Sequence, residues 1–139
     1  MTLRSVLGQY LLAMAVFLAL DMVWLTLVAP DLYDRYLGDL LADEPNVAAA
    51  VLFYAIFVAG LLHFVVRPAL EKESARDALV RGAAFGLVTY ATWDLTSLAV
   101  IEGFPVTIAV IDMTWGAVLA AGVSTVTYHL WRRLTTPRS

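Results

Sequence analysis

Four long apolar stretches take up most of this 139-residue chain, over residues 8–29, 47–66, 82–101 and 106–130. A helix that crosses a lipid bilayer needs roughly 20 mainly apolar residues. The stretches are continuous and show no alternation between apolar and polar positions, which favours helices over barrel strands. The high hydrophobic content, 61%, is typical of integral membrane proteins. We therefore predict an all-α membrane protein, a four-transmembrane-helix bundle that forms one domain over residues 1–139.

Turn-forming residues separate these stretches. Pro30 closes the first, Arg67 and Pro68 end the second, and Gly103 with Pro105 lies between the third and the fourth. The first stretch is too long for a secretory signal and lacks a small-x-small cleavage site, so we expect it to be retained. Cysteine is absent, which excludes disulfides and thiolate metal sites.

Basic residues lie almost entirely on one side of the predicted helices. That side holds Arg4, Arg67, Lys72, Arg76, Arg81, Arg132, Arg133 and Arg138, whereas Arg35 alone lies on the other. Cytoplasmic loops carry an excess of Lys and Arg. We therefore predict that both termini are cytoplasmic, in a bacterial inner membrane. Nothing in this charge pattern indicates a nucleic-acid partner.

The first external loop is predicted to contain a short amphipathic helix on the membrane surface. Its apolar residues recur at helical spacing: Leu32, Tyr33, Tyr36, Leu37, Leu40 and Leu41. A solvated loop with a few anchoring aromatic residues is the alternative. Neither interpretation implies chemistry.

Three aspartates, Asp21, Asp94 and Asp112, lie within the apolar stretches, and no Lys or Arg accompanies them there. Each aspartate near the centre of a bilayer costs about 2.5–3.5 kcal/mol on an insertion scale, which makes it a candidate functional residue. Counted at a rise of about 1.5 Å per residue, all three reach one level in the outer half of the membrane. Tyr54 falls near that level, whereas His63 lies in the inner half.

Aromatic side chains gather at the same level. Trp24 and Trp115 each follow an aspartate by three residues and so share its helix face. We interpret these rings as candidate walls for an organic ligand or cation, with aromatic core packing or lipid-facing rings as the alternatives. The complete set of candidate binding residues is Asp94, Asp112, Asp21, Tyr90, Tyr54, Trp93, Trp115, Trp24 and Ser97.

The acids are compatible with four roles. They could exchange protons in a coupled transporter, or Asp21, Asp94 and Asp112 could hold a divalent cation. Asp94 and Asp112 could also act as acid and base on a lipid, or the carboxyls could form a polar knot that fixes helix register. The sequence leaves these open and identifies no cofactor or catalytic residue.

Proton- or cation-coupled transport of a small molecule is our first hypothesis. A membrane enzyme or accessory factor acting on lipid and a structural membrane subunit are the alternatives. An enzyme is less favoured than a binding or transport protein. The expected partners are the lipid bilayer, a small amphipathic ligand or cation, and a second copy of the chain in a homodimer.

Small residues predict close packing of the third and fourth helices. One stripe comprises Gly82 and Gly86 and continues to Tyr90 and Asp94, and the facing stripe comprises Asp112, Gly116, Ala120 and Ser124. If the stripes meet, both acids lie at the contact between the two helices.

Several strings resemble a known family: FY at 53–54 with Gly60 and PAL at 68–70, YATWDLT at 90–96, and IDMTWG at 111–116. They are similar to the domain-of-unknown-function 2177 family of small four-helix bacterial inner-membrane proteins, and the resemblance spans nearly the whole chain. Trp93 and Ser97 depart from its pattern, where Tyr and Asn are common. The resemblance implies a four-helix membrane protein and no established activity.

Overall fold

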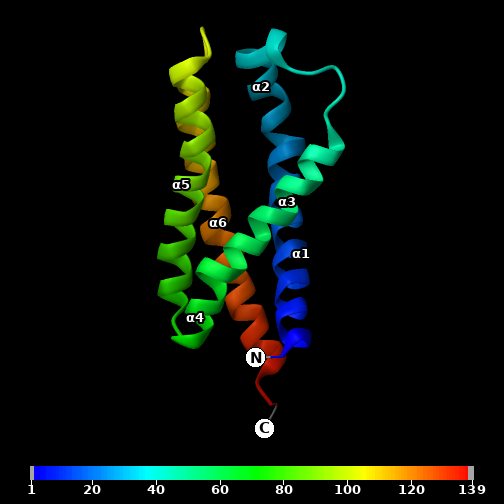
Figure 1. The fold of residues 1–139 in the computed structure, drawn as a ribbon, viewed down its shortest axis with the longest axis vertical. Helices are drawn as coiled ribbons and strands as arrows, with labels where there is room; N and C mark the ends of the chain where they lie inside the picture. Colours follow the sequence, from blue (N-terminus) through cyan, green and yellow to red (C-terminus); the bar gives the residue numbers. More distant parts are fainter. Residues whose placement is uncertain (1, 138–139) are drawn as a thin grey trace.

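The computed structural model describes residues 2–137, so Arg138 lies outside the described residues. The regular elements in this range are all helical, and the chain starts and ends at the same end of the molecule (Figure 1). In chain order they are α1 (Leu3–Leu27), α2 (Ala29–Leu37), η1 (Gly38–Leu40), α3 (Val47–Leu61), η2 (Leu62–Val66), α4 (Arg67–Glu71), α5 (Ala75–Val100) and α6 (Val106–Thr135).

Three helical segments are long and apolar enough to cross a membrane: α1, the continuous α3–η2–α4 segment and α6. Helix α5 has 26 residues, and Asp94 with several Thr and Ser residues makes it less apolar than the other three. The prediction of an all-helical membrane protein is confirmed with three candidate spans. The fourth span remains a prediction.

The predicted helix ends differ from those observed at several positions. Helix α5 begins at Ala75 rather than at 82, because the Ser74 hydroxyl accepts a hydrogen bond from the Asp77 N–H at 3.1 Å and caps the helix there. Helix α6 continues to Thr135 rather than to 130. Pro30 does more than close the first helix, since it occupies the first turn of α2, where a missing N–H is tolerated.

The prediction that Arg67 and Pro68 end the second helix was wrong. A π-helical turn, η2, joins α3 to α4, and the Arg67 N–H donates to the carbonyl of Leu62. Pro68 follows this turn directly and lies in the first turn of α4. The helical segment therefore continues to Glu71.

Helices α5 and α6 form the most extensive helix–helix contact in the described chain. A Cβ on Gly82 would lie 2.8 Å from the Ala120 carbonyl oxygen, and a Cβ on Gly86 would overlap the Gly116 carbonyl. Only glycine allows two helix backbones to approach this closely. The predicted contact between the two small-residue stripes is confirmed.

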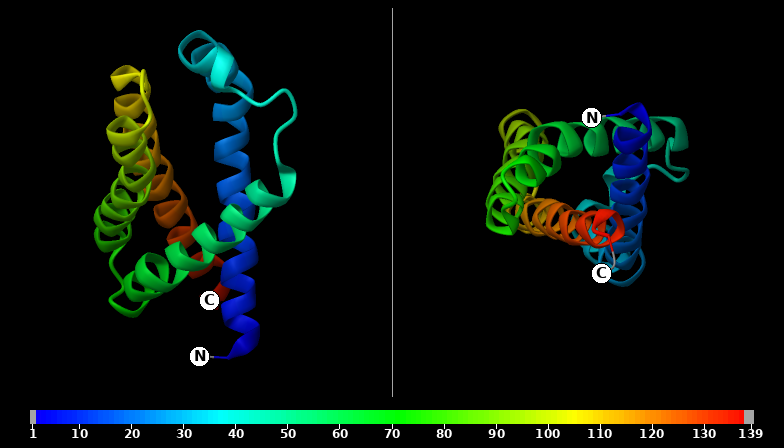
Figure 2. Two further views of the ribbon diagram at one scale, coloured as in Figure 1. Left: turned by 45° about the horizontal axis from the view of Figure 1, so that its top comes forward. Right: turned by 90° about the horizontal axis from the view of Figure 1, so that it is seen from below.

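The central core joins α1, α3 and α6. Phe17 packs edge-on against Tyr54 with ring centroids 5.2 Å apart and lies 5.5 Å from Phe57, and Leu119 of α6 closes the cluster. Seen from below, α1, α3, α5 and α6 surround this core (Figure 2). Many large aliphatic side chains remain exposed on the outside of the bundle, as expected for a surface that faces lipid.

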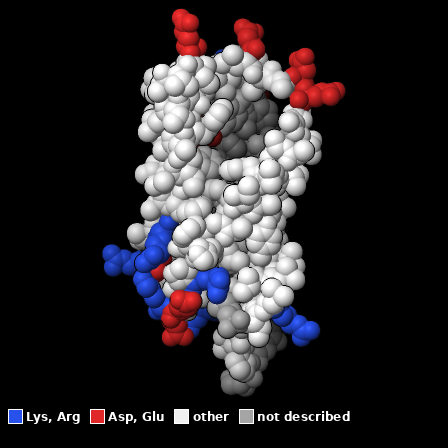
Figure 3. Space-filling view, viewed as in Figure 1, with Lys and Arg blue, Asp and Glu red and all other residues white. Residues whose placement is uncertain are grey.

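On the face shown in Figure 3, charged side chains gather at the two ends of the molecule, and little charge is visible between them. We call the end where Lys and Arg gather the basic end and the opposite end the acidic end. The ion pairs of residues 2–137 lie at the basic end, including Arg81 with Asp77 at 2.8 Å. This distribution matches the side on which the sequence placed the basic residues.

The amphipathic helix predicted for the first loop is present as α2 and η1. Leu32, Tyr33 and Leu37 pack against Phe104 and Ile108 near the start of α6. Part of its apolar face therefore contacts the protein. Location on the membrane surface remains a prediction.

A Gly86→Ala substitution tests the α5–α6 contact. We expect it to lower the free energy of unfolding by about 1–3 kcal/mol, because the added methyl group would force the two backbones apart. Gly38→Ala is the matched control, since no atom lies within 4 Å of a Cβ at that position. Thermal unfolding in detergent measures both. Equal midpoints for the two variants would contradict the close contact.

Candidate functional site

A cavity of about 290 Å³ lies among α1, α2, α3, α5 and α6. Figure 3 shows a hollow in the half of the molecule near the acidic end, with an acidic side chain visible at its wall. The lining residues are Asp21, Trp24, Leu25, Tyr33, Ala50, Phe53, Tyr54, Tyr90, Asp112 and Trp115. Acidic, phenolic and indole groups from five separate helices thus meet at one place.

Six of the nine residues predicted as a binding site line this cavity: Asp21, Trp24, Tyr54, Tyr90, Asp112 and Trp115. Asp94, Ser97 and Trp93 do not. Trp93 is 60% exposed on the outside of α5, so it is no wall of this cavity, and the lipid-facing alternative fits its position. Trp93 and its neighbour Asp94 have different surroundings because adjacent residues of a helix point about 100° apart.

Asp112 accepts a short hydrogen bond of 2.6 Å from the Tyr33 hydroxyl. Burial raises the pKa of the Tyr33 phenol, and the bond to Asp112 raises it further, so Tyr33 remains a donor at neutral pH. Tyr33 was predicted only as part of a membrane-surface helix. The helical spacing of Leu32, Tyr33 and Leu37 was the signal, and the sequence did not reveal that α2 folds back over α6.

Asp21 is held from the opposite side of the cavity. Its side chain is 8% exposed and accepts a hydrogen bond from the Tyr54 hydroxyl at 3.3 Å. The Trp115 indole lies near this carboxyl, yet its N–H is buried without an acceptor in hydrogen-bond geometry. Trp115 also stacks on Trp24, with ring centroids 4.6 Å apart and planes 7° from parallel. The stacked pair forms a flat aromatic wall beside the two acids.

Asp94 is fully buried behind the cavity wall, and neither of its oxygens accepts a hydrogen bond from the described residues. Its carboxyl faces that of Asp112 closely enough for the two to interact. A proton on one of the two would convert this contact into a hydrogen bond, because a protonated carboxyl donates and a carboxylate accepts. Ser97 is buried one turn further along α5, at 3% exposure.

The three aspartates do not form the divalent-cation site considered from the sequence. Within residues 2–137, no group of three His, Cys, Asp or Glu side chains is placed to hold a metal ion. Asp21 and Asp112 lie on separate helices around the cavity, and Asp94 faces only Asp112. A hard divalent cation needs several oxygen ligands at 2.0–2.6 Å, roughly equidistant from one point.

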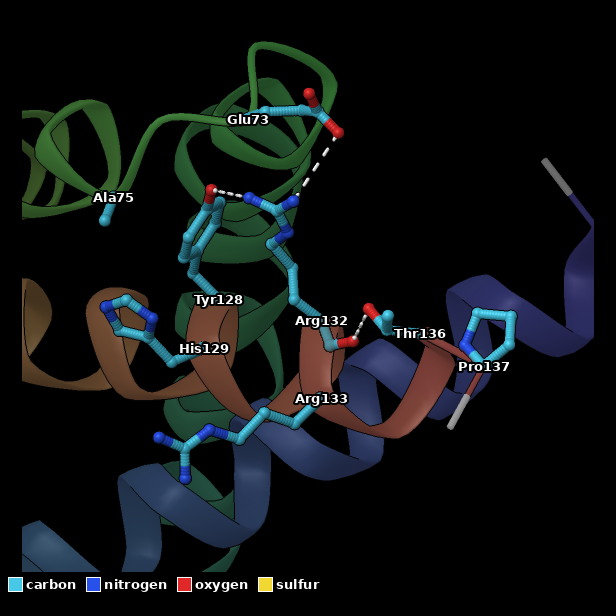
Figure 4. A pocket seen from close by; sticks show the side chains of 8 residues that line it. All are labelled: Glu73, Ala75, Tyr128, His129, Arg132, Arg133, Thr136 and Pro137. Atoms are coloured by element: carbon cyan, nitrogen blue, oxygen red, sulfur yellow. Dashed lines mark hydrogen bonds and ion pairs between the residues drawn. The ribbon is translucent and has the colours of Figure 1, made fainter. Parts of the chain in front are cut away.

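A larger groove of about 940 Å³ lies at the basic end (Figure 4). Arg132 donates to the Tyr128 hydroxyl at 2.9 Å and pairs with Glu73 at 3.6 Å. Its guanidinium group is thus already engaged, and His129 and Arg133 lie on the other side of the groove in the same view. The groove is wide open, which suits contact with solvent or headgroups more than capture of a small ligand.

A family described as "Predicted membrane protein (DUF2177)" matches residues 6–129. The chain belongs to the DUF2177 family. This confirms the resemblance drawn from the sequence strings. The family's description as a membrane protein agrees with the apolar helices of this chain. No curated protein and no solved structure matches the chain. The site of this DUF2177 protein is therefore interpreted from its own residues.

A Tyr33→Phe substitution tests the bond between α2 and α6. Loss of the hydroxyl should lower the free energy of unfolding by about 1.5 kcal/mol, because the partner is a carboxylate. It should also speed amide hydrogen exchange in α2. Tyr36→Phe is the matched control, since Tyr36 is on the same helix and 38% exposed. Unchanged exchange in α2 of the Tyr33 variant would contradict the bond.

Proposed function

We propose that this protein binds a small organic cation in the cavity between Asp21 and Asp112 and exchanges it for protons across the membrane. The observation that carries the proposal is the composition of the wall: two carboxyls with no Lys or Arg beside them, and the stacked pair Trp24 and Trp115. An organic ammonium group would neutralise the acids. The adjacent aromatic faces would attract it through cation–π interactions.

The cavity volume supports a small ligand. Pockets for drug-sized molecules measure about 300–1,000 Å³, and this cavity, at about 290 Å³, lies just below that range. Its wall is mostly aromatic and aliphatic, with hydroxyls of Tyr33 and Tyr54 already bonded to the acids. A compact ligand with one charged group and an apolar body fits this chemistry.

Asp94 supplies the coupling in this proposal. A proton shared between Asp94 and Asp112 relieves the repulsion of two carboxylates in contact. A cation bound at Asp112 would stabilise its charged form and release that proton. Binding of cation and proton would thus exclude one another, which is the requirement for exchange.

We further propose that α5 is the fourth span and that both termini are cytoplasmic. Helix α5 packs along α6, and the chain starts and ends at one end of the molecule (Figure 1). The basic end would face the cytoplasm, in a bacterial inner membrane. The cavity would then lie in the outer half of the bilayer. Two copies of this small bundle would together enclose a transport pathway.

A structural role is the second candidate, and two hydrogen bonds favour it. Tyr33 binds Asp112 and Tyr54 binds Asp21, so two of the acids are partly satisfied by the protein itself. Such bonds fix helix register in membrane proteins. The lipid-enzyme alternative is less supported, because Asp94 does not line the cavity and so cannot pair with Asp112 on a substrate there.

The proposal is tested by titrating tetramethylammonium chloride into the purified protein and measuring tryptophan fluorescence. Sodium chloride at the same concentrations is the control salt. We expect Asp112→Asn to weaken binding by about tenfold or more, equal to about 1.4 kcal/mol. Asp39→Asn in η1 is the matched control and should bind like the wild type. If Asp112→Asn and Asp21→Asn lower only the unfolding temperature and leave binding unchanged, the structural role is correct and the cation site is not.

Proton coupling is tested separately in proteoliposomes. Addition of tetramethylammonium to one side of wild-type vesicles should move protons to that side, as reported by a pH-sensitive dye inside the vesicles. Asp94→Asn should retain cation binding and lose proton movement, because the shared proton is gone. Proton movement at the wild-type rate in that variant would exclude Asp94 as the coupling residue.

A further inference from the structure

A second cavity, of about 300 Å³, lies at the opposite end of the bundle, between α1 and the α3–η2–α4 segment. Its lining is apolar along most of its length and basic at one end. The lining residues are Leu3, Val6, Leu7, Tyr10, Ala59, Leu62, His63 and Arg67. None of these was among the predicted site residues, and the cavity is separate from the one at Asp112.

Arg67 carries an unused donor at this cavity. Its Nε is buried and makes no hydrogen bond to the described residues, and its guanidinium forms no ion pair within residues 2–137. Burial of a charged donor without a partner is costly. An arginine guanidinium binds phosphate through parallel N–H groups. An anionic oxygen at this place would satisfy it.

The two basic side chains of this cavity lie one helical turn apart, at the π turn η2. η2 begins at Leu62, directly before His63, and its last residue, Val66, directly precedes Arg67. Residues four apart lie on nearly one face of a helix, and π turns occur often at functional sites. Both side chains line the same cavity as a result. The turn thus orients two basic groups toward one ligand.

The apolar part of the cavity opens to the surface that faces lipid. Leu3 is 84% exposed and Leu7 is 55% exposed on the first turns of α1. An apolar groove on a membrane-spanning surface, with cations at the basic end, complements an acyl chain joined to an anionic headgroup. Inorganic phosphate would fill the basic part alone and leave the apolar part empty.

We propose that this groove is a specific site for one anionic phospholipid, with an acyl chain along α1 and α3 and the phosphate on Arg67 and His63. The lipid belongs to the leaflet at the basic end. The lipid joins α1 to the α3–η2–α4 segment, because its acyl chain lies between them and its phosphate binds Arg67 and His63 of that segment. This site does not depend on the function proposed for the cavity at Asp112.

The test measures which lipids remain on the protein. Detergent-purified protein is incubated with phosphatidylglycerol or phosphatidylcholine, and the lipids retained are counted by native mass spectrometry. We expect one tightly retained phosphatidylglycerol on the wild type and a roughly fivefold weaker affinity in Arg67→Gln, the factor for loss of one basic contact. Arg76→Gln is the matched control, an exposed arginine at the same end, and should retain the lipid.

Ala59→Phe provides a variant that keeps every charge. Ala59 is exposed and lines the groove, so a phenyl ring there should fill the acyl part and reduce phosphatidylglycerol retention without disturbing the core. Retention equal to the wild type in both Arg67→Gln and Ala59→Phe would overturn the proposal. Displacement of the lipid by glycerol 3-phosphate alone would show an anion site rather than a lipid site, and would overturn it as well.

Discussion

The backbones of α5 and α6 touch at Gly86 and Gly116, and the candidate site follows from that contact. With no side chain between them, the helices stay close enough for Tyr90 to lie across Gly116, where any Cβ would overlap its ring. Tyr90 is thereby turned into the cavity. One turn further along α5, the same close approach brings Asp94 against Asp112. A packing constraint between two glycines thus determines where two carboxyls meet.

The carboxyls are accommodated in three different ways. Asp112 is bonded by Tyr33 from outside the bundle, Asp21 by Tyr54 from a neighbouring helix, and Asp94 only faces another acid. The cost of an ionisable group in an apolar bundle rises as its partners decrease. Asp94 is therefore the acid with the fewest partners among the described residues, and Asp112 is the acid that borders both the cavity and Asp94. The exchange proposed above rests on this difference between the three acids.

The apolar runs, the small-residue stripes and the spacing of Asp21 with Trp24 were enough to predict the helices, the α5–α6 contact and most of the cavity wall. These features depend on local periodicity, which a sequence displays directly. The continuation through Pro68 and the role of Tyr33 were not predictable in the same way. The first depends on a π turn that widens the helix before the proline, and the second on the direction in which α2 returns after Val28. Both are set by packing between segments distant in the chain.

Helix α3 explains why the molecule has a cavity at each end. It crosses the bundle obliquely in Figures 1 and 2, with α3 against α1 and with η2 and α4 against α5. Toward the acidic end the segment diverges from α5 and α6. Its first turns, with Ala50 and Tyr54, therefore line a space there instead of filling it. Toward the basic end the segment diverges from α1, and the groove beside Arg67 lies between the two. The tilt of this one segment therefore sets the width of both cavities, because its residues line each of them.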